Sequence, residues 1–314
     1  MTILFSITFL VSAVLFKLSQ KYFIKKNKYD EIKKRSSHTV KATRSGGASI
    51  FISLSLIVIY LYSTSNQIFD FSVFLPLGIL FTVGLYDDIY QIDFKLKFIF
   101  QLIVAKILID QGIIVSNFNG FLGIYEIPYL LSQLITIFII VYIINATNFS
   151  DGIDGLASTE VVKCLLIVLI LNNWSEINNY NFFFVLTLIS ILPIYYFNFK
   201  RNNKVFLGDS GSLLLGGIVS IALVNTNNLE LVNINLSLNT PLLILVCYTY
   251  PIIDSTYVIL KRILAKKSPF IADNTHIHHI LLNKGFSHFK CLIVLSGITG
   301  IFQFLILIYI TKFT

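Results

Sequence analysis

Five groups of polar residues interrupt a chain that is otherwise strongly apolar. Each group combines side chains that could bind a metal ion, a phosphate or a proton. The groups are His38-Thr39-Val40-Lys41 with Arg44, Asp87-Asp88, Asn148 with Asp151 and Asp154, Gly208-Asp209-Ser210, and His276-Ile277-His278-His279. Ionisable residues next to long apolar segments are costly to place, and they usually mark a functional site. These groups therefore contain the candidate functional residues.

Asn148 and Asp209 lie in two glycine-containing segments whose chemistry suits a phosphate-bound metal ion. The segments are Asn145-Ala-Thr-Asn-Phe-Ser-Asp-Gly-Ile-Asp-Gly155 and Phe206-Leu-Gly-Asp-Ser-Gly-Ser212. Glycines permit tight turns, and free N–H groups at a helix start can bind phosphate. Mg²⁺ takes oxygen ligands from protein, water and substrate phosphate. The alternative is that these residues only cap helices and form turns, but two such segments on one face favour a site.

The adjacent carboxylates Asp87 and Asp88 end an apolar segment, in Gly84-Leu-Tyr-Asp-Asp88. Two neighbouring carboxylates repel each other, so they favour a nearby cation. Lys95 and Lys97 follow, and Gln101 lies one helical turn beyond Lys97. A merely solvated acidic loop is the alternative, although the whole chain has only 16 acidic residues.

The histidine group suggests either a metal or a phosphate. Zinc is disfavoured because no cysteine lies near, and His276, His278 and His279 cannot close a tetrahedral site alone. Imidazole N–H groups can donate to phosphate, which is the simpler interpretation. A loop that holds histidines by chance is a weaker alternative, because three of the five histidines fall within four positions.

The first group precedes the glycine pair Gly46-Gly47, and its cations His38, Lys41 and Arg44 could meet an anionic headgroup. Ordinary positive charge beside a membrane is the competing interpretation. It is strong for the lysines and arginine between 25 and 35, and weaker for Arg44, which lies almost against the glycines.

Asp254 is an isolated carboxylate within an apolar segment, in Tyr250-Pro-Ile-Ile-Asp254. Such a residue is a functional candidate by default. Pairing with Arg262, about two helical turns away, is a structural alternative. We therefore leave Asp254 out of the catalytic set.

The composition predicts an all-α, polytopic integral membrane protein. The 314 residues are 55% hydrophobic and 13% charged, with a mean hydropathy of +0.79, which leaves too little charge to cover a soluble domain. A spanning helix needs about 20 apolar residues. We expect a single domain over 1–314 with about ten transmembrane helices, of which the sixth and eighth are short. The expected helices are 2–24, 46–63, 72–86, 97–116, 127–146, 159–172, 181–198, 211–226, 238–262 and 289–312.

The distribution of lysine and arginine predicts the orientation of these helices. If both termini lie outside, nearly all positive charge falls inside, as cytoplasmic loops require. That orientation places all five polar groups and all five histidines on the cytoplasmic side. The net charge of +8 then reflects loops next to anionic lipid, and not nucleic-acid binding.

Two further features have simple interpretations. The cysteines Cys164, Cys247 and Cys291 have no metal-ligand spacing, so we expect small packing residues without a disulfide. The first apolar segment lacks a basic n-region and a small-residue cleavage site, so we interpret it as a retained helix and not a cleaved signal.

Four of these motifs, in this order, resemble the polyprenyl-phosphate N-acetylhexosamine-1-phosphate transferases, which include WecA-, TagO- and WbpL-like enzymes and, more distantly, MraY. The resemblance runs from about Arg35 to Phe286. The motifs are Asp87-Asp88 with Lys95-Leu-Lys97 and Gln101; Asn145-X-X-Asn148-X-X-Asp151-Gly-X-Asp154-Gly155; Gly208-Asp209-X-Gly211-Ser212; and His276-Ile-His-His279. Each motif is weak alone, and together they are specific.

The resemblance implies an activity. A polyprenyl (undecaprenyl) phosphate attacks the β-phosphorus of a UDP-N-acetylhexosamine, UMP leaves, and a lipid-linked sugar forms on the cytoplasmic leaflet of the bacterial inner membrane. Mg²⁺, or alternatively Mn²⁺, would be the cofactor, and the resemblance allows a homodimer. The family roles carry over onto three sets of positions. The metal ligands would be Asn148 and Asp209; the catalytic carboxylates Asp87, Asp88 and Asp151; and the substrate-binding residues Arg44, Lys95, Lys97, Asp154, His276, His278 and His279.

One departure from the family pattern concerns the first group. Many relatives have Pro-Thr-Pro-Arg before the glycine pair, whereas this chain has Lys41-Ala-Thr-Arg44, so a less rigid first loop is expected. Arg35-Ser-Ser-His38 is closer to WbpL-like enzymes, and Ser268-Pro-Phe-X-X-Asp273 is closer to WecA and TagO. UDP-N-acetylglucosamine is therefore the leading donor among several.

The main rival to an enzyme is a transporter of an anionic substrate, which would also have polar residues among its helices. Transporters place such residues near the middle of the membrane, whereas these groups are predicted to gather at one interface.

Overall fold

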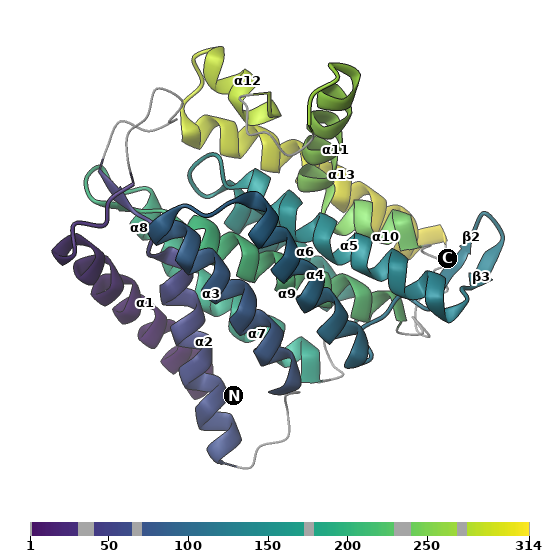
Figure 1. The fold of residues 1–314 in the computed structure, drawn as a ribbon, viewed down its shortest axis with the longest axis horizontal. Coiled ribbons are helices and arrows are strands. Elements are labelled where there is room, and N and C mark those ends of the chain that lie inside the picture. The colour runs from purple at the N-terminus through teal and green to yellow at the C-terminus, as the bar shows by residue number, and fades with distance from the viewer. Residues whose placement is uncertain are drawn as a thin grey trace.

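The computed structural model describes residues 2–30, 41–64, 71–172, 179–228, 240–268 and 275–313, which form a helical bundle (Figure 1). The helices are α1 (Thr2–Lys25), α2 (Gly46–Ser63), η1 (Phe71–Val73), α3 (Phe74–Tyr90), α4 (Phe94–Asp110), α5 (Tyr129–Ser150), α6 (Leu156–Leu171), α7 (Asn179–Ile191), α8 (Pro193–Asn198), α9 (Gly208–Asn228), α10 (Thr240–Cys247), α11 (Thr249–Leu264), α12 (Ile277–Asn283) and α13 (His288–Phe313). The strands are β1 (Ala42–Thr43), β2 (Asn117–Phe121), β3 (Ile124–Glu126) and β4 (Lys204–Val205).

The polytopic all-α fold is confirmed, and each of the ten predicted segments contains a helix. The segment 97–116 is helical only as far as Asp110, and 181–198 is two helices, α7 and α8. Seven helical spans in the described residues are long and apolar enough to cross a membrane, or eight if α10 and α11 form one bent span. Helices α4 and α6 are shorter, with 17 and 16 residues. A count of ten spans is therefore not confirmed. The eighth predicted segment, 211–226, lies within the longer helix α9, which has 21 residues.

The ninth predicted segment is not one continuous helix, contrary to expectation. It is α10 and α11, which meet at an angle of 103°. Pro251 lies four residues after Cys247, and a proline there removes a helical hydrogen bond and clashes with the carbonyl of that residue. The chain therefore turns at Tyr248, and α11 leaves the bundle toward α12 (Figure 1).

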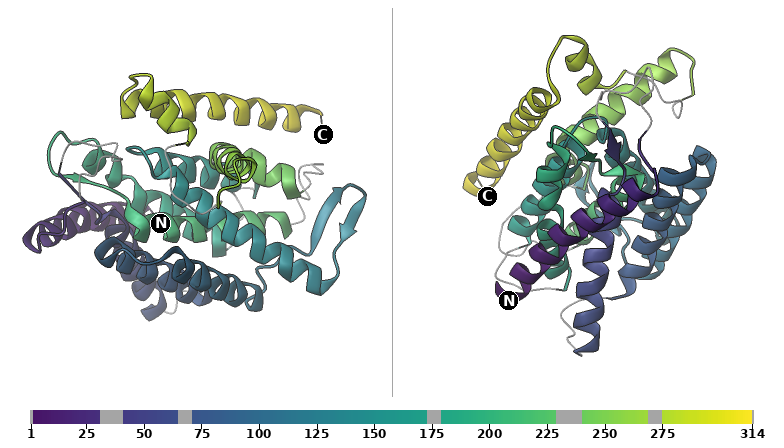
Figure 2. Two further views of the ribbon diagram at one scale, coloured as in Figure 1. Left: turned by 45° about the horizontal axis from the view of Figure 1, so that its top comes forward. Right: turned by 90° about the vertical axis from the view of Figure 1, so that its left-hand side faces the viewer.

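Helix α9 is the centre of the bundle, and it packs against α2, α3, α5 and α6. In its most apolar window, 89% of the residues are buried, compared with 17% for the peripheral helices α1 and α13 (Figure 2). Glycines permit the close approach: a Cβ on Gly47 would overlap the backbone of Gly211, and one on Gly84 would overlap that of Asp209. The core around α9 thus fixes where its first turn lies.

The segment before α2 is joined to the segment before α9. Strands β1 and β4 are parallel, with Ala42 opposite Lys204. The pairing continues as Gly46 N–H donates to Phe206 O (3.0 Å) and Gly47 N–H donates to Leu207 O (2.9 Å). The described end of the first loop is therefore held beside the start of α9.

The three cysteines are buried and unpaired, as the sequence predicts. Helix α1 packs on α2, α7 and α8, and Ser12 Oγ donates to Ser190 O at 2.7 Å. It is thus an integral part of the bundle.

Candidate active site

The first turn of α9 is capped by a side chain from another helix. Asp88, at the end of α3, accepts from Asp209 N–H through Oδ1 (2.9 Å), and from Ser210 N–H (2.9 Å) and Ser210 Oγ (2.7 Å) through Oδ2. The first N–H groups of a helix have no partner within it, so this carboxylate supplies what α9 lacks. Gly208 has φ +74°, which side chains rarely adopt, and a Cβ there would lie 2.6 Å from Asp88 Oδ2. The backbone conformation and the lack of space therefore each require glycine at this position.

The neighbouring carboxylate, Asp87, forms an ion pair with a different residue. Its Oδ2 lies 2.8 Å from the ammonium of Lys97, which also pairs with Asp209. Its Oδ1 accepts from Ile92 N–H at 2.8 Å. Lys97 thus connects two predicted site residues, and the expected cation next to the Asp87-Asp88 pair is present.

Lys95, in contrast, does not join the cluster. Its side chain is exposed, and within the described part of the chain its ammonium makes no hydrogen bond or ion pair. It lies at the second position of α4 after the cap Asp93, where its backbone N–H bonds to the Asp93 carboxylate. The helix periodicity directs Lys97, and not Lys95, toward Asp209.

Asn148 and Asp151 approach α9 from the end of α5. Asn148 Nδ2 donates to Ser212 Oγ at 2.8 Å, and Ser212 lies one turn along α9 from Asp209. Among the described residues no donor bonds to Asn148 Oδ1, which leaves this oxygen available to a ligand.

Lys97 and Arg44 compensate the charge of the acidic groups around Asp209 only in part, because they face the four carboxylates of Asp87, Asp88, Asp151 and Asp209. The pKa of Asp151 is raised well above its ordinary range, because the group is desolvated and because Asp209 and Asp88 lie near it. A bound divalent cation would relieve that repulsion. The oxygens of Asn148, Asp151 and Asp209 are the hard ligands that Mg²⁺ prefers, so these residues fit the predicted ion.

Asp154 forms a separate buried pair on the other side of the Asp151 turn. It pairs with the ammonium of Lys204 and with His288, whose Nδ1 lies 3.5 Å from its carboxylate. Burial would raise the pKa of Asp154, but His288 and Lys204 hold it below its ordinary value. Sequence reasoning missed both partners, because each lies at least 50 residues away and neither belongs to a motif.

The histidine loop is held by Asp254. The His276 ring donates through Nδ1 to Asp254 Oδ2 at 2.7 Å, and Ile277 N–H donates to Asp254 Oδ1 at 2.7 Å. Asp254 is fully buried. The ring of His276 lies edge-on to Phe149, the neighbour of Asn148, with centroids 5.5 Å apart. Asp254 thus orients His276 toward the site, in place of the Arg262 pairing considered from the sequence.

His278 lies between Tyr250 and Gly152, a residue of the turn after Asp151. It is buried, and its Nδ1 lies 3.1 Å from Tyr250 Oη. Its other nitrogen lies so near Gly152 that a Cβ there would overlap it. Burial, and then the neighbouring His279, lower the pKa of His278 to about 3, so the ring is neutral at pH 7. It contacts the turn after Asp151 as a neutral ring, and its role in binding substrate stays a prediction.

Ligand atoms of Asp254, His276 and His278 lie within 4.8 Å of one another, which is close enough to consider a cation. However, Asp254 and Tyr250 already occupy the Nδ1 atoms of the two rings. These hydrogen bonds orient both rings, and the sequence argument against zinc stays a prediction.

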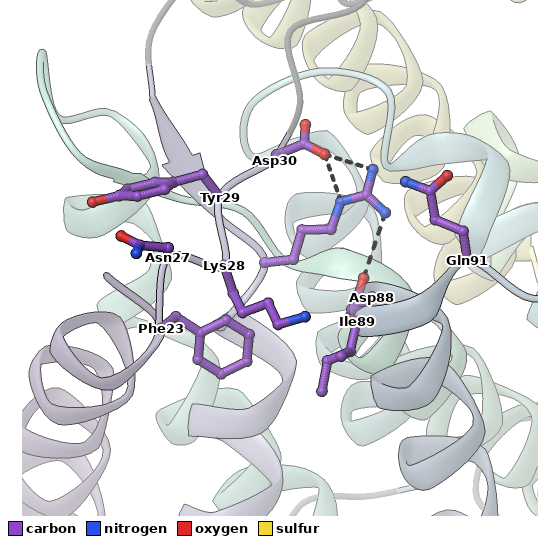
Figure 3. Close-up of a pocket in the computed structure, with 9 residues that line it drawn as sticks. Phe23, Asn27, Lys28, Tyr29, Asp30, Asp88, Ile89 and Gln91 are labelled. Carbon is purple, nitrogen blue, oxygen red and sulfur yellow. Dashed lines mark hydrogen bonds and ion pairs between the residues drawn. The ribbon is translucent and has the colours of Figure 1, made fainter. Parts of the chain in front are cut away.

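Arg44 is linked to the site by an ion pair with Asp88. Its Nη1 lies 3.7 Å from Asp88 Oδ1, and its Nε and Nη2 each lie 2.8 Å from Asp30 Oδ1. Asp30 and Asp88, both labelled in Figure 3, line a cavity of about 210 Å³ together with Arg44. His38, Thr39 and Val40 of the same group, and the 269–274 part of the stretch before His276, lie outside the described residues.

An apolar cavity of about 410 Å³ extends along α5 as far as Phe149, the neighbour of Asn148. Helices α4, α5 and α11 form its walls, which are lined mainly by leucine, isoleucine and aromatic side chains such as Leu102, Phe138 and Ile259. Asn145 and Phe149 also line it, next to Asn148 in the sequence. Asn145 donates to Gln101 Oε1 at 2.7 Å, and Gln101 Nε2 is buried with no hydrogen-bond partner among the described residues. The cavity thus joins an apolar wall to polar groups.

Known proteins are similar to this chain over most of its length. A probable undecaprenyl-phosphate N-acetylglucosaminyl 1-phosphate transferase of Bacillus subtilis (strain 168) is 29% identical over 310 residues, or 95% of this chain and 82% of the relative. A decaprenyl-phosphate N-acetylglucosaminephosphotransferase of Mycolicibacterium smegmatis is 28% identical, over 87% of this chain and 73% of the relative. An undecaprenyl-phosphate alpha-N-acetylglucosaminyl 1-phosphate transferase of Yersinia pestis is 26% identical, over 92% and 78% respectively.

A family profile matches residues 70–227, just over half of the chain. The matched region contains Asp87, Asp88, Lys97, Asn148 and Asp209, the residues that converge on the first turn of α9. The chain therefore belongs to glycosyl transferase family 4.

Proposed function

We propose that this protein transfers an N-acetylhexosamine-1-phosphate from a UDP-sugar to a polyprenyl phosphate, with release of UMP. The observation that carries the proposal is the convergence of Asp87, Lys97, Asn148 and Asp209 at one end of α9, beside an apolar cavity. The relatives described above are named for a reaction of this kind, with N-acetylglucosamine as the sugar. UDP-N-acetylglucosamine is therefore the first donor to test.

The two substrates require two different surfaces, and the site region offers both. A polyprenyl chain is apolar and suits the cavity between α4, α5 and α11. A diphosphate suits the polar groups around Asp209. The buried Gln101 Nε2 has no partner within the part of the chain that the structure describes, so it is a donor available to the phosphate of the lipid acceptor.

The mechanism we propose depends on positioning and charge neutralisation. The second pKa of a phosphate monoester is about 6, so the acceptor is mostly dianionic at neutral pH and needs no strong general base. Lys97 offers a positive charge next to Asp87 and Asp209, and Asp88 keeps the first turn of α9 in place. Asp154 with Lys204 and His288 forms a polar wall that we assign to the uridine part of the donor.

Mg²⁺, or Mn²⁺ in its place, would be held by Asn148 and Asp209 with Asp151 near, and would neutralise the diphosphate of the donor. We place the reaction at the cytoplasmic face of the bacterial inner membrane, with both termini outside, because that orientation keeps the lysines and arginines inside.

A membrane assay tests the proposal. Vesicles containing the protein receive labelled UDP-N-acetylglucosamine and undecaprenyl phosphate, with and without Mg²⁺, and labelled lipid and UMP are measured. We expect lipid product and UMP in equal amounts, and only with the metal and the acceptor. Uptake of intact UDP-sugar without lipid product would support the transporter instead. UMP release without acceptor would contradict direct displacement.

A further inference from the structure

Asp30 belongs to none of the sequence motifs, yet it closes the base of the first loop. Its N–H donates to Ala42 O at 2.8 Å, and its carboxylate binds two nitrogens of Arg44 at 2.8 Å. The Asp30 side chain is only 14% exposed and that of Arg44 33%, so water screens the pair partially. Two contacts on one oxygen fix the direction of the guanidinium.

The fixed guanidinium of Arg44 faces Asp88 (Figure 3). The Asp88 side chain is completely buried, and a buried carboxylate needs a compensating charge. Asp87, its neighbour, uses Lys97 instead. Among the described residues, Arg44 is thus the cation in contact with Asp88, and its direction depends on Asp30.

The first turn of α9 depends in turn on Asp88. The backbone pairing between the first loop and residues 204–207 ends at Leu207, one residue before Gly208. From that point the N–H groups of Asp209 and Ser210 bind the Asp88 carboxylate. Asp88 therefore sets the path of the backbone that presents the Asp209 side chain.

We propose that Asp30 is a positioning residue for Asp209: Asp30 fixes Arg44, Arg44 neutralises Asp88, and Asp88 holds the first turn of α9. The proposal rests on the proposed function only in taking Asp209 as a metal ligand. It also assigns Arg44 to the support of the site, and not to direct contact with substrate.

A cavity of about 210 Å³ lies beside these contacts. Its walls carry both signs of charge, with Lys28 and Arg44 against Asp30 and Asp88, so no single ligand charge is favoured. The function we infer lies in the contacts themselves.

We call the contacts that lead from Asp30 through Arg44 and Asp88 to Asp209 the relay. Asp30→Asn tests it, because the substitution removes the charge of the side chain and keeps its size. Hydrogen–deuterium exchange of the metal-free protein reports on the amides of Asp209 and Ser210. Mn²⁺ titration followed by electron paramagnetic resonance reports on metal affinity without any reaction. We expect exchange of these amides to be about tenfold faster and Mn²⁺ binding about tenfold weaker, with exchange in α5 and α6 unchanged.

Three further variants sharpen the result. Asp30→Glu restores the charge and should recover at least part of the Mn²⁺ affinity. The double variant Asp30→Asn/Arg44→Gln should have the same Mn²⁺ affinity and the same exchange rates as Arg44→Gln within about twofold, because both substitutions interrupt the same series of contacts. Asp110→Asn is the matched control: its carboxylate pairs with Lys106 four residues away and is 56% exposed, so it should behave as the wild type.

The relay is overturned if Asp30→Asn keeps wild-type exchange at Asp209 and Ser210 and wild-type Mn²⁺ affinity. General acceleration of exchange throughout α5 and α6 would also overturn it, since that means loosened packing. If the wild type makes no lipid product, the proposed function fails, whereas faster exchange at Asp209 in Asp30→Asn would still support the relay. The two failures are therefore distinguishable.

Discussion

The two sides of the candidate site hold their carboxylates in different ways. On the side of α3, α4 and α9, Asp87, Asp88 and Asp209 are held by the cations Lys97 and Arg44. On the side of α11 and α12, Asp254 is held by hydrogen bonds from His276 and from the backbone of Ile277. The charged groups on the first side can pair with a metal ion or a phosphate. The second side is a support that fixes direction.

The largest effect is expected on the charged side, where Lys97 and Lys95 can be compared. Lys97→Gln should lower the rate of lipid product formation roughly 10²–10³-fold, because it removes a preorganised charge that contacts two site carboxylates. Lys95→Gln should lower it by less than about threefold, since that side chain is exposed. Initial rates in the vesicle assay measure both, and equal effects would contradict the difference between the two lysines.

A smaller effect is expected on the support side. In Asp254→Asn, one oxygen and one NH₂ group replace two acceptors, so His276 Nδ1–H and Ile277 N–H cannot both keep their bonds. We expect a loss of about 10–100-fold in kcat/KM for the UDP-sugar, as for other residues that orient a functional group. A variant within twofold of the wild type would show that His276 needs no such support.

The smallest effect concerns stability and its dependence on pH. The pKa of Asp154 is below its ordinary value, so its ion pair stabilises the protein above about pH 3.9, and the contribution is lost as the pH falls through the lower folded value. Lys204→Gln should therefore cost about 1–3 kcal/mol at pH 7 and less near pH 3. Thermal unfolding in detergent at both pH values measures this, and a difference that grows on acidification would contradict the sign.

The sequence predicts the helices well and their irregularities poorly. Long apolar runs make all ten segments recognisable, because membrane helices satisfy their own backbone. The 103° bend between α10 and α11 was missed, although Pro251 is visible in the sequence. The apolar run continues through the proline, and hydropathy alone cannot distinguish a bent helix from a straight one.

The site was predictable where residues lie in short motifs and not where partners come from distant segments. The spacing around Asn148 and Asp209 correctly indicates groups that converge. The partners Asp30 of Arg44, Lys204 and His288 of Asp154, and Asp254 of His276 belong to no motif, and only the fold brings them together. The metal itself, and the roles assigned to these residues, remain predictions.

The most direct test of the central claim is lipid product formation as a function of Mg²⁺ concentration in the wild type, Asn148→Ala and Asp209→Asn, with folding checked by thermal unfolding. The account predicts a saturable Mg²⁺ requirement in the wild type and a loss of roughly 10²-fold or more in each folded variant. Product formed at the wild-type rate by folded Asp209→Asn, or by wild type in the presence of a chelator, would contradict it.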